Sequence, residues 1–311
     1  MKKLLTAVSI ALLLTTPIEK AAAQYYFYDN NYYDSPIMYE LGASVGFMNC
    51  FTDLGGRKGI GKKFVKDLNM GNSQLAGSVF LSAIWRNAIA LRVEASFGTV
   101  KADDAILKKV KATTFGRYER NLSFKSNITE FMVAAEIHPL YLINKYEDEK
   151  EPPRFSPYLL AGVGFFSFKP QAKLGGAWVD LQPLSTEGQG FAEYPNRKPY
   201  KLSQANFPLG LGVKYELTSK LNIRGEFVYR ILSTDYLDDV STNYIDVSLY
   251  PNYFTGNKLT NAFLLNDRQY ELDPLHITNE GDQRGSAKHN DAYFTFNIKV
   301  GLTFGRERIK R

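Results

Sequence analysis

Apolar and polar residues alternate with a period of two along most of the chain, which is the pattern of β-strands. Eight runs show this alternation: 37–48, 74–86, 88–100, 125–138, 158–168, 205–217, 221–232 and 292–304. Each run has about 11 to 14 residues, more than the 5 or 6 that are typical of strands in soluble proteins. That length is sufficient for a tilted strand to cross about 25 Å of hydrocarbon.

The polar positions of these strands are often charged. In the run 221–232, Ile223 and Phe227 share one face, whereas Arg224, Glu226 and Arg230 share the other. A soluble sandwich would bury the apolar face and expose the charges, and a membrane barrel would do the reverse. The periodicity alone leaves both folds open.

The lengths of the connections separate the two folds. Four connections are long (49–73, 101–124, 169–204 and 233–291), and they alternate with tight turns at Asn87 and 218–220 and an intermediate turn at 139–157. Up-and-down membrane barrels have short periplasmic turns and long extracellular loops, whereas Greek-key sandwiches do not sort their loops in this way. The sequence therefore predicts an all-β fold, an eight-stranded antiparallel up-and-down transmembrane β-barrel over residues 37–304.

The N-terminus predicts export by a cleaved signal peptide. Residues 1–23 have a basic start, an apolar stretch and the small residues Ala21, Ala22 and Ala23. Cleavage would remove three lysines and one glutamate, lowering the formal charge from +6 to +4. So small a charge does not indicate nucleic-acid binding. Elsewhere no run of about 20 apolar residues indicates a spanning helix, and the single cysteine excludes a disulfide scaffold.

An eight-stranded barrel has a narrow lumen that side chains fill. The predicted inward set has six carboxylates and five cations: Glu40, Arg92, Glu94, Glu130, Glu136, Lys214, Glu216, Arg224, Glu226, Arg230 and Lys299. Unpaired charges are costly in such a space, whereas a fully paired network can be satisfied. We expect structural salt bridges here, and an ion path is the alternative.

The sequence gives little sign of enzyme chemistry, and we expect no catalytic, cofactor or metal site. Glu136 and His138 share a strand face, but catalysis would need a Ser or Asp that converges on a histidine in the fold. Loop residues Asp235, Asp238 and Asp239 could hold calcium, although they lack the Gly and the closing Glu of an EF-hand loop.

Residues 24–36 form a predicted periplasmic arm that is rich in aromatic residues, and residues 305–311 form a basic C-terminal tail. Exposed aromatic clusters often mark interaction sites. The candidate partner-binding residues are Tyr25, Tyr26, Tyr28, Tyr32 and Tyr33. The alternative is an aromatic girdle at the membrane interface.

Several loop motifs resemble those of the PorG-like family of Bacteroidota outer-membrane barrels. They are Asp53-Leu54-Gly55-Gly56, Arg120-Asn121-Leu122-Ser123-Phe124, Leu181-Gln182-Pro183-Leu184 with Thr186-Glu187-Gly188-Gln189-Gly190, and Thr234-Asp235-Tyr236-Leu237-Asp238-Asp239-Val240-Ser241. The resemblance implies an OmpA-like barrel in outer-membrane lipid and a component of the type IX secretion system. It also implies association with a periplasmic lipoprotein ring of the PorK/PorN type.

From the resemblance we expect a non-enzymatic structural anchor in secretion. The first alternative is a stand-alone structural or adhesive outer-membrane barrel, which would need the same strands. The second alternative is a lipid-modifying barrel enzyme.

Overall fold

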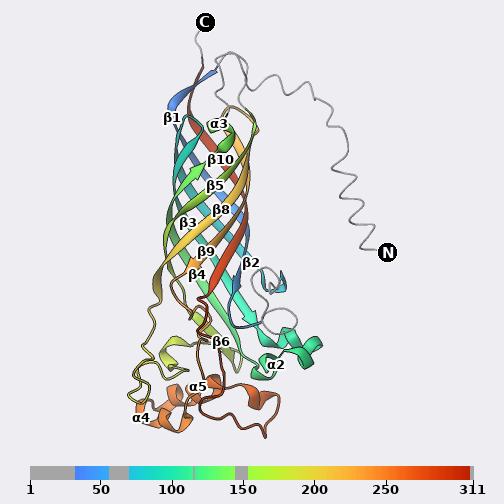
Figure 1. Ribbon diagram of the computed structural model, residues 1–311, viewed down its shortest axis with the longest axis vertical. Helices are drawn as coiled ribbons and strands as arrows, with labels where there is room; N and C mark the ends of the chain where they lie inside the picture. The colour runs from blue at the N-terminus through green and yellow to red at the C-terminus, as the bar shows by residue number, and fades with distance from the viewer. Residues whose placement is uncertain (1–31, 56–69, 115, 144–152, 309–311) are drawn as a thin grey trace, which may run out of the picture.

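Eight long strands close into an antiparallel barrel in the computed structural model, which describes residues 32–55, 70–114, 116–143 and 153–308 (Figure 1). They are β1 (Tyr32–Phe51), β2 (Gln74–Trp85), β3 (Ile89–Asp103), β4 (Ser123–Ile137), β5 (Phe155–Ser167), β8 (Ser203–Glu216), β9 (Leu221–Leu232) and β10 (Ala292–Arg308). Each strand pairs with its neighbours in this order, and the pairing of β10 with β1 closes the barrel. The predicted eight-stranded up-and-down fold is confirmed.

The two faces of the barrel wall differ in the way that a membrane requires. On β4, Phe131 points outward and is 59% exposed, while the neighbouring Met132 is buried. The other strands likewise present Leu, Val, Ile or Phe outward, and six of the eight strands (β1, β3, β4, β8, β9 and β10) bury charged residues inside. In water this arrangement would expose the apolar face and bury the charges, whereas in lipid it satisfies both faces. The wall is therefore that of a membrane-spanning barrel.

The two ends of the barrel are unlike each other. One end, here called the turn end, has the start of β1 and the end of β10, the tight turns after β2 and β8, and the short helix α3 (Pro139–Ile143). Between β2 and β3, Arg86 and Asn87 have φ angles of 49° and 57°, which match the twist of a two-residue hairpin turn. The other end, here called the loop end, has all the long connections.

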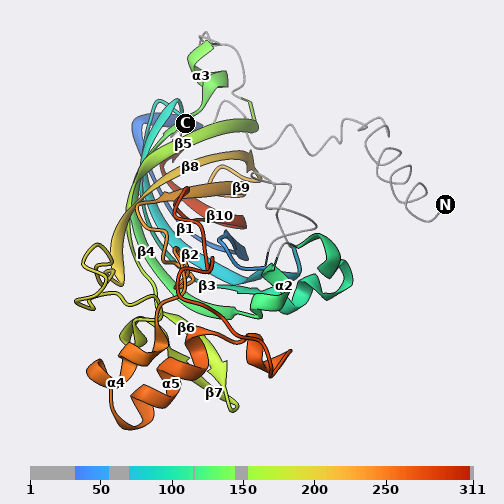
Figure 2. The same cartoon turned by 60° about the horizontal axis from the view of Figure 1, so that its bottom comes forward.

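The long connections fold together into an ordered cap at the loop end (Figure 2). A hairpin of β6 (Pro170–Leu174) and β7 (Ala177–Asp180) extends from β4. The helical segments are η3 (Met70–Asn72), η4 (Asp104–Thr113), α2 (Arg117–Arg120), η5 (Gln182–Leu184), η6 (Val247–Leu249), α4 (Tyr250–Tyr253), α5 (Gly256–Asn266) and η7 (Gln269–Glu271). No helix in the described part of the chain is long and apolar enough to cross a membrane. The sequence periodicity did not predict these cap elements, because they are short and irregular.

The terminal strands are longer than predicted. Tyr32 pairs with Arg308 and Tyr33 with Glu307, so the arm expected at 24–36 and the tail expected at 305–311 are partly strand. The first pair between β1 and β2 is Ile37 with Trp85. The terminal pairs therefore form a two-stranded ribbon beyond β2, which backbone hydrogen bonds can hold without an apolar pattern. The signal peptide and Tyr25, Tyr26 and Tyr28 lie outside the described residues.

Candidate functional site

The structure places the eleven charged residues of the predicted lumen set inside the barrel. They are Glu40 on β1, Arg92 and Glu94 on β3, Glu130 and Glu136 on β4, Lys214 and Glu216 on β8, Arg224, Glu226 and Arg230 on β9, and Lys299 on β10. Each of them is at most 5% exposed. Charges buried this deeply require partners with good geometry.

A four-residue cluster occupies the middle of the lumen. Arg92 Nη1 lies 2.5 Å from Glu226 Oε2 and 3.2 Å from Glu94 Oε2. Lys299 Nζ lies 2.5 Å from Glu94 Oε2 and 2.9 Å from Glu226 Oε1. Each charge in this cluster thus has two partners of opposite sign, which compensates for the loss of hydration.

The network continues toward both ends of the barrel. Glu136 contacts both Arg92 and Arg224, the second at 3.0 Å. Arg224 also lies 2.5 Å from Glu40, which in turn lies 3.2 Å from Lys214. In a separate pair toward the loop end, Arg230 lies 3.0 Å from Glu130. These crosslinks support the interpretation as structural salt bridges over that as an ion path.

Sequence periodicity missed a sixth lumen cation. Arg306 Nη1 lies 3.1 Å from Glu216 Oε2, so six cations now balance six carboxylates. Along β10 the inward positions are odd-numbered, such as Lys299, and Arg306 breaks this rule. The preceding Gly305 has a φ of 99°, and this left-handed residue interrupts the alternation. No parity rule could have placed Arg306 inside.

Two aromatic side chains in the lumen were also missed. The Phe80 ring lies 5.1 Å from the Arg92 guanidinium and 5.1 Å from the Lys299 ammonium, at cation–π distance. Tyr158 donates a 2.7 Å hydrogen bond to Glu226. A Cβ at Gly42 would lie 2.4 Å from the Phe80 ring, so glycine makes room for this ring.

A serine lies next to His138, and catalysis would need such a Ser or Asp neighbour of a histidine. His138 Nδ1 lies 2.8 Å from Ser156 Oγ, and its Nε2 lies 3.4 Å from Glu136 Oε2. This is the order of a nucleophile, a base and an acid. However, Ser156 and His138 are each 3% exposed, and Glu136 is already engaged by two arginines. A substrate could not reach this hydroxyl without disrupting the lumen network, so we interpret the group as structural.

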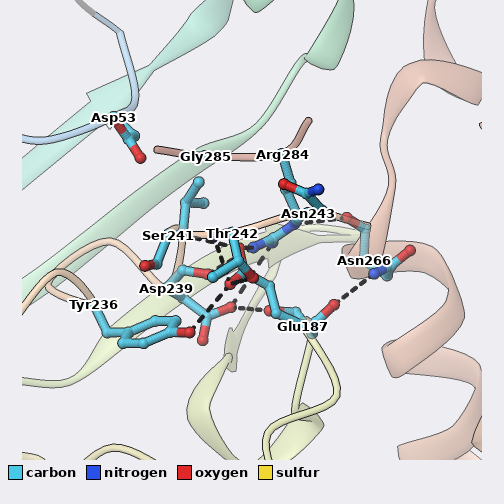
Figure 3. A network of polar contacts seen from close by, with 12 residues as sticks. Asp53, Glu187, Tyr236, Asp239, Ser241, Thr242, Asn243, Asn266, Arg284 and Gly285 are labelled. Carbon is cyan, nitrogen blue, oxygen red and sulfur yellow. Dashed lines mark hydrogen bonds and ion pairs between the residues drawn. The ribbon is translucent and has the colours of Figure 1, made fainter. Parts of the chain in front are cut away.

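At the loop end, the buried carboxylate of Glu187 organises the cap (Figure 3). It accepts 2.9 Å hydrogen bonds from the backbone N–H groups of Ser241 and Thr242, and a 2.7 Å bond from the Thr242 hydroxyl. Arg284 Nη1 lies 3.0 Å away and also donates to the Asp239 carbonyl at 2.6 Å. The nearby carboxylates hold the pKa of Arg284 above its ordinary value despite burial. One buried ion pair thus joins three cap segments.

A second arginine attaches this cluster to the barrel side of the cap. Arg120 lies 2.8 Å from Asp104, and it donates to the carbonyl of Arg284 at 2.6 Å and to that of Asp53 at 2.8 Å. The Asp53 carboxylate accepts a 2.6 Å bond from the backbone N–H of Ser286. All four loop motifs singled out in the sequence therefore meet in one network.

A ladder of aromatic rings connects the lumen to the cap. The ring of Tyr293 lies 5.7 Å from that of Phe166, which lies 5.3 Å from that of Phe168. Phe168 then stacks on Tyr200 at 6.1 Å, and Tyr200 on Tyr236 at 4.8 Å. The cap thus shares one hydrophobic core with the loop end of the barrel, and it is not a set of independent loops.

The aspartates considered for calcium serve the cap itself. Asp235 accepts from the Ser241 hydroxyl at 2.7 Å, and Asp238 accepts from the backbone N–H of Leu54 at 3.2 Å. Asp239 accepts from the Tyr200 hydroxyl at 2.7 Å. Within the described residues, no group of three or more His, Cys, Asp or Glu side chains is arranged to hold a metal ion.

A cavity of about 1310 Å³ lies between the barrel and the cap. Its lining includes Asp53, Tyr229, His276, Asp282 and Lys288. Because these groups have both signs of charge, they do not define one ligand chemistry.

The cap aspartates predict a pH-dependent cap. Burial raises the pKa of Asp235 to about 8, and that of Asp53 and Asp239 to about 6. Burial also raises the pKa of Asp238 and Asp291, well above the ordinary 3.8. The folded cap therefore holds protons that an unfolded chain has released, so stability is full at low pH and falls as the pH rises toward 8.

In Asp235→Asn the amide keeps an acceptor for Ser241 but does not titrate. We expect wild type to lose more hydrogen-exchange protection at 234–241 than the variant as the pH rises from about 6 to about 8. Comparing the two proteins at each pH cancels the intrinsic change in exchange rate. If protection depended on pH in the same way in both proteins, Asp235 would not contribute to the pH dependence of the cap.

Fold and site together define a membrane-spanning β-barrel with a salt-bridged lumen and a folded cap. A scan against protein-family models finds no match, and no curated protein sequence is significantly similar. Among solved structures, the chain is similar to the attachment invasion locus protein Ail of Yersinia pestis, with 9% identity and a TM-score of 0.38 over 87% of this chain and 100% of that one.

Two further solved structures are similar in the same way. For a major outer membrane protein of Thermus thermophilus the identity is 12% and the TM-score 0.37, over 87% of this chain and 100% of that one. For Neisserial surface protein A the identity is 9% and the TM-score 0.35, over 87% of this chain and 98% of that one. The likeness is one of β-barrel architecture alone.

Proposed function

We propose that this chain is a non-enzymatic outer-membrane barrel that acts as a structural anchor in type IX secretion. The observation that carries the proposal is the ribbon of β1 and β10 at the turn end. Tyr32–Arg308 and Tyr33–Glu307 pair beyond the last residue that β2 contacts. In an outer-membrane barrel with its long loops outside, this ribbon projects into the periplasm, where a ring of PorK/PorN-like proteins would lie.

The lumen supports a structural role over transport. Its charges are paired across the barrel from strand to strand, and Phe80 and Tyr158 fill the space between them. A barrel stiffened in this way suits a fixed attachment point. The buried Ser156 disfavours the lipid-modifying alternative, since a lipid acyl chain would have to reach a hydroxyl inside the lumen.

Replacing Tyr25, Tyr26, Tyr28, Tyr32 and Tyr33 with serine tests the anchor. We expect the barrel to insert and to keep its heat-modifiable mobility on a gel, because backbone hydrogen bonds, which the serines keep, pair Tyr32 and Tyr33 with β10. Crosslinking in cells followed by purification should then recover at least about tenfold less ring protein, since aromatic side chains dominate interface energies. Secretion should fall in parallel.

The matched control is Tyr253→Ser with Tyr270→Ser, which removes exposed tyrosines from the cap. This control should leave ring recovery unchanged. A five-serine variant that inserts, retains ring protein and secretes normally would remove the arm from the proposal.

A second candidate is a stand-alone adhesive barrel, which the ordered cap favours. Glu187 and Arg284 hold the cap segments in one fixed arrangement, as a surface that binds other cells or matrix would require. Normal secretion in a deletion strain, together with lost surface attachment, would favour this candidate over the anchor.

A further inference from the structure

Four neighbouring strands show the same outward order of side chains as they approach the loop end. Each passes from a phenylalanine that is at least 50% exposed, through small or polar residues, to a lysine. The pairs are Phe97 and Lys101 on β3, Phe131 and Lys125 on β4, Phe165 and Lys169 at β5, and Phe207 and Lys201 at β8. We call these four lysines the lysine arc.

The lysines of the arc lie side by side around the barrel wall. Lys101 is directly opposite Lys125 in the ladder between β3 and β4. Lys169 and Lys201 lie just past the paired strand ends, where the Phe168 N–H still donates to the Leu202 carbonyl at 2.9 Å. Neighbouring strands are about 4.8 Å apart, so Lys101 and Lys125 form a close pair of cations. Lys125 lies opposite Gln171, two positions along the chain from Lys169, so the arc is a stepped row.

Few described groups of the protein neutralise this row. Lys169 lies 2.8 Å from Asp180, and Asp103 lies near Lys101 on the same face of β3. Lys125 lies 4.0 Å from the ring of Trp178, which is 47% exposed. Like charges directly opposite each other in a sheet are destabilising. The pair Lys101 and Lys125 therefore favours an anion that lies between them.

Among the described residues, the arc is confined to one half of the barrel. On β9, β10 and β2 the corresponding described outward positions past the apolar band are Ser233, Asn290 and Ser73. Past β1 the chain reaches Asp53, whose carboxylate joins the cap network. A general preference of the headgroup region for lysine would have placed lysines on both halves. The asymmetry instead indicates a site for a particular anionic partner.

We propose that the lysine arc binds the phosphate groups of lipid A in the membrane leaflet at the loop end. The arc lies just past the exposed phenylalanines, where the apolar band gives way to headgroups, and Trp178 is of the type found at that interface. Lysine binds phosphate as a point charge, and the acyl chains of the same lipid would pack against the four phenylalanines. The choice of lipid A rests on the proposed outer-membrane location, because that lipid occupies its outer leaflet.

The test uses the purified full chain in nanodiscs of phosphatidylcholine with or without lipid A. Native mass spectrometry counts lipid A molecules that stay bound on release from the disc. The variant K101Q/K125Q/K201Q removes three charges of the arc and spares Lys169, which is paired with Asp180. The control K198Q/K258Q/K288Q removes three exposed lysines of the cap.

We expect wild type and the cap control to retain lipid A, and the arc variant to retain at least about tenfold less, since each basic residue at an anionic surface contributes about fivefold. The variant K101R/K125R/K201R should restore retention, and inorganic phosphate should not compete. Heat-modifiable mobility of every variant shows that the barrel is folded.

Equal retention by the arc variant and the cap control would overturn the inference, as would a wild type that shows no preference for lipid A. Neither outcome depends on secretion. The two proposals can therefore fail separately: ring association can be lost while lipid A binding is intact, or lipid A binding can be lost while ring association is intact.

Discussion

Arg224→Leu is expected to lower the free energy of unfolding of the barrel by about 3–5 kcal/mol, because it removes one of the cationic partners of two buried carboxylates. Arg224 lies 2.5 Å from Glu40 and 3.0 Å from Glu136, and its guanidinium is fully inside the lumen. The leucine can neither pair with these two carboxylates nor bring water to them. Urea titration in detergent micelles, followed by fluorescence of Trp85 and Trp178, measures the change.

The control for this prediction is Lys198→Leu, which removes an exposed cation of the cap. It should shift the unfolding midpoint little, since exposed charges contribute little to stability. If the two variants unfolded at the same urea concentration, the lumen network would not be the source of barrel stability.

Glu187→Ala is expected to open the cap without unfolding the barrel. The change removes the closer carboxylate partner of Arg284 and leaves it only the Asp239 carboxylate at 3.8 Å. It also leaves the N–H groups of Ser241 and Thr242 without an acceptor. A loss of about 3–5 kcal/mol is typical when one partner of a buried pair is removed. Limited proteolysis of the segment 234–291 should become far faster, while heat-modifiable mobility on a gel stays that of a folded barrel.

The matched control lies in the same cap segment. Glu193→Ala removes an exposed carboxylate that accepts a 2.7 Å hydrogen bond from Tyr253. It should leave proteolysis close to the wild-type rate. Resistance of Glu187→Ala equal to that of the control would mean that the aromatic ladder alone holds the cap.

The barrel could be predicted from the sequence because alternate residues of a membrane-spanning strand must suit either lipid or the lumen. Each residue faces either lipid or lumen, so Phe227 and Glu226 could be assigned to opposite faces from their parity alone. Strand ends were less predictable. Tyr32 and Arg308 pair past the apolar band, where backbone hydrogen bonds act and side chains give no pattern.

The cap could not be predicted in the same way. Glu187 and Arg284 are 97 residues apart in the chain, and no local pattern indicates that they form one buried pair. The adjacent glycines Gly188 and Gly285 indicate turns or close backbone contacts in these segments, but they do not indicate that the segments pair. The resemblance of four loop motifs drew attention to the right segments, but their convergence is a property of the tertiary structure.

The closure of the barrel by β1 and β10 has a consequence for biogenesis. These strands are the first and the last of the barrel in the chain, and their ladder includes Glu40 with Thr303 and Ser44 with Lys299. Until β10 has paired with β1, β1 has an unpaired edge and Glu94 lacks the ammonium group of Lys299. Any assembly state in which β10 is not yet paired is therefore an open, incompletely neutralised sheet, which must be protected from aggregation.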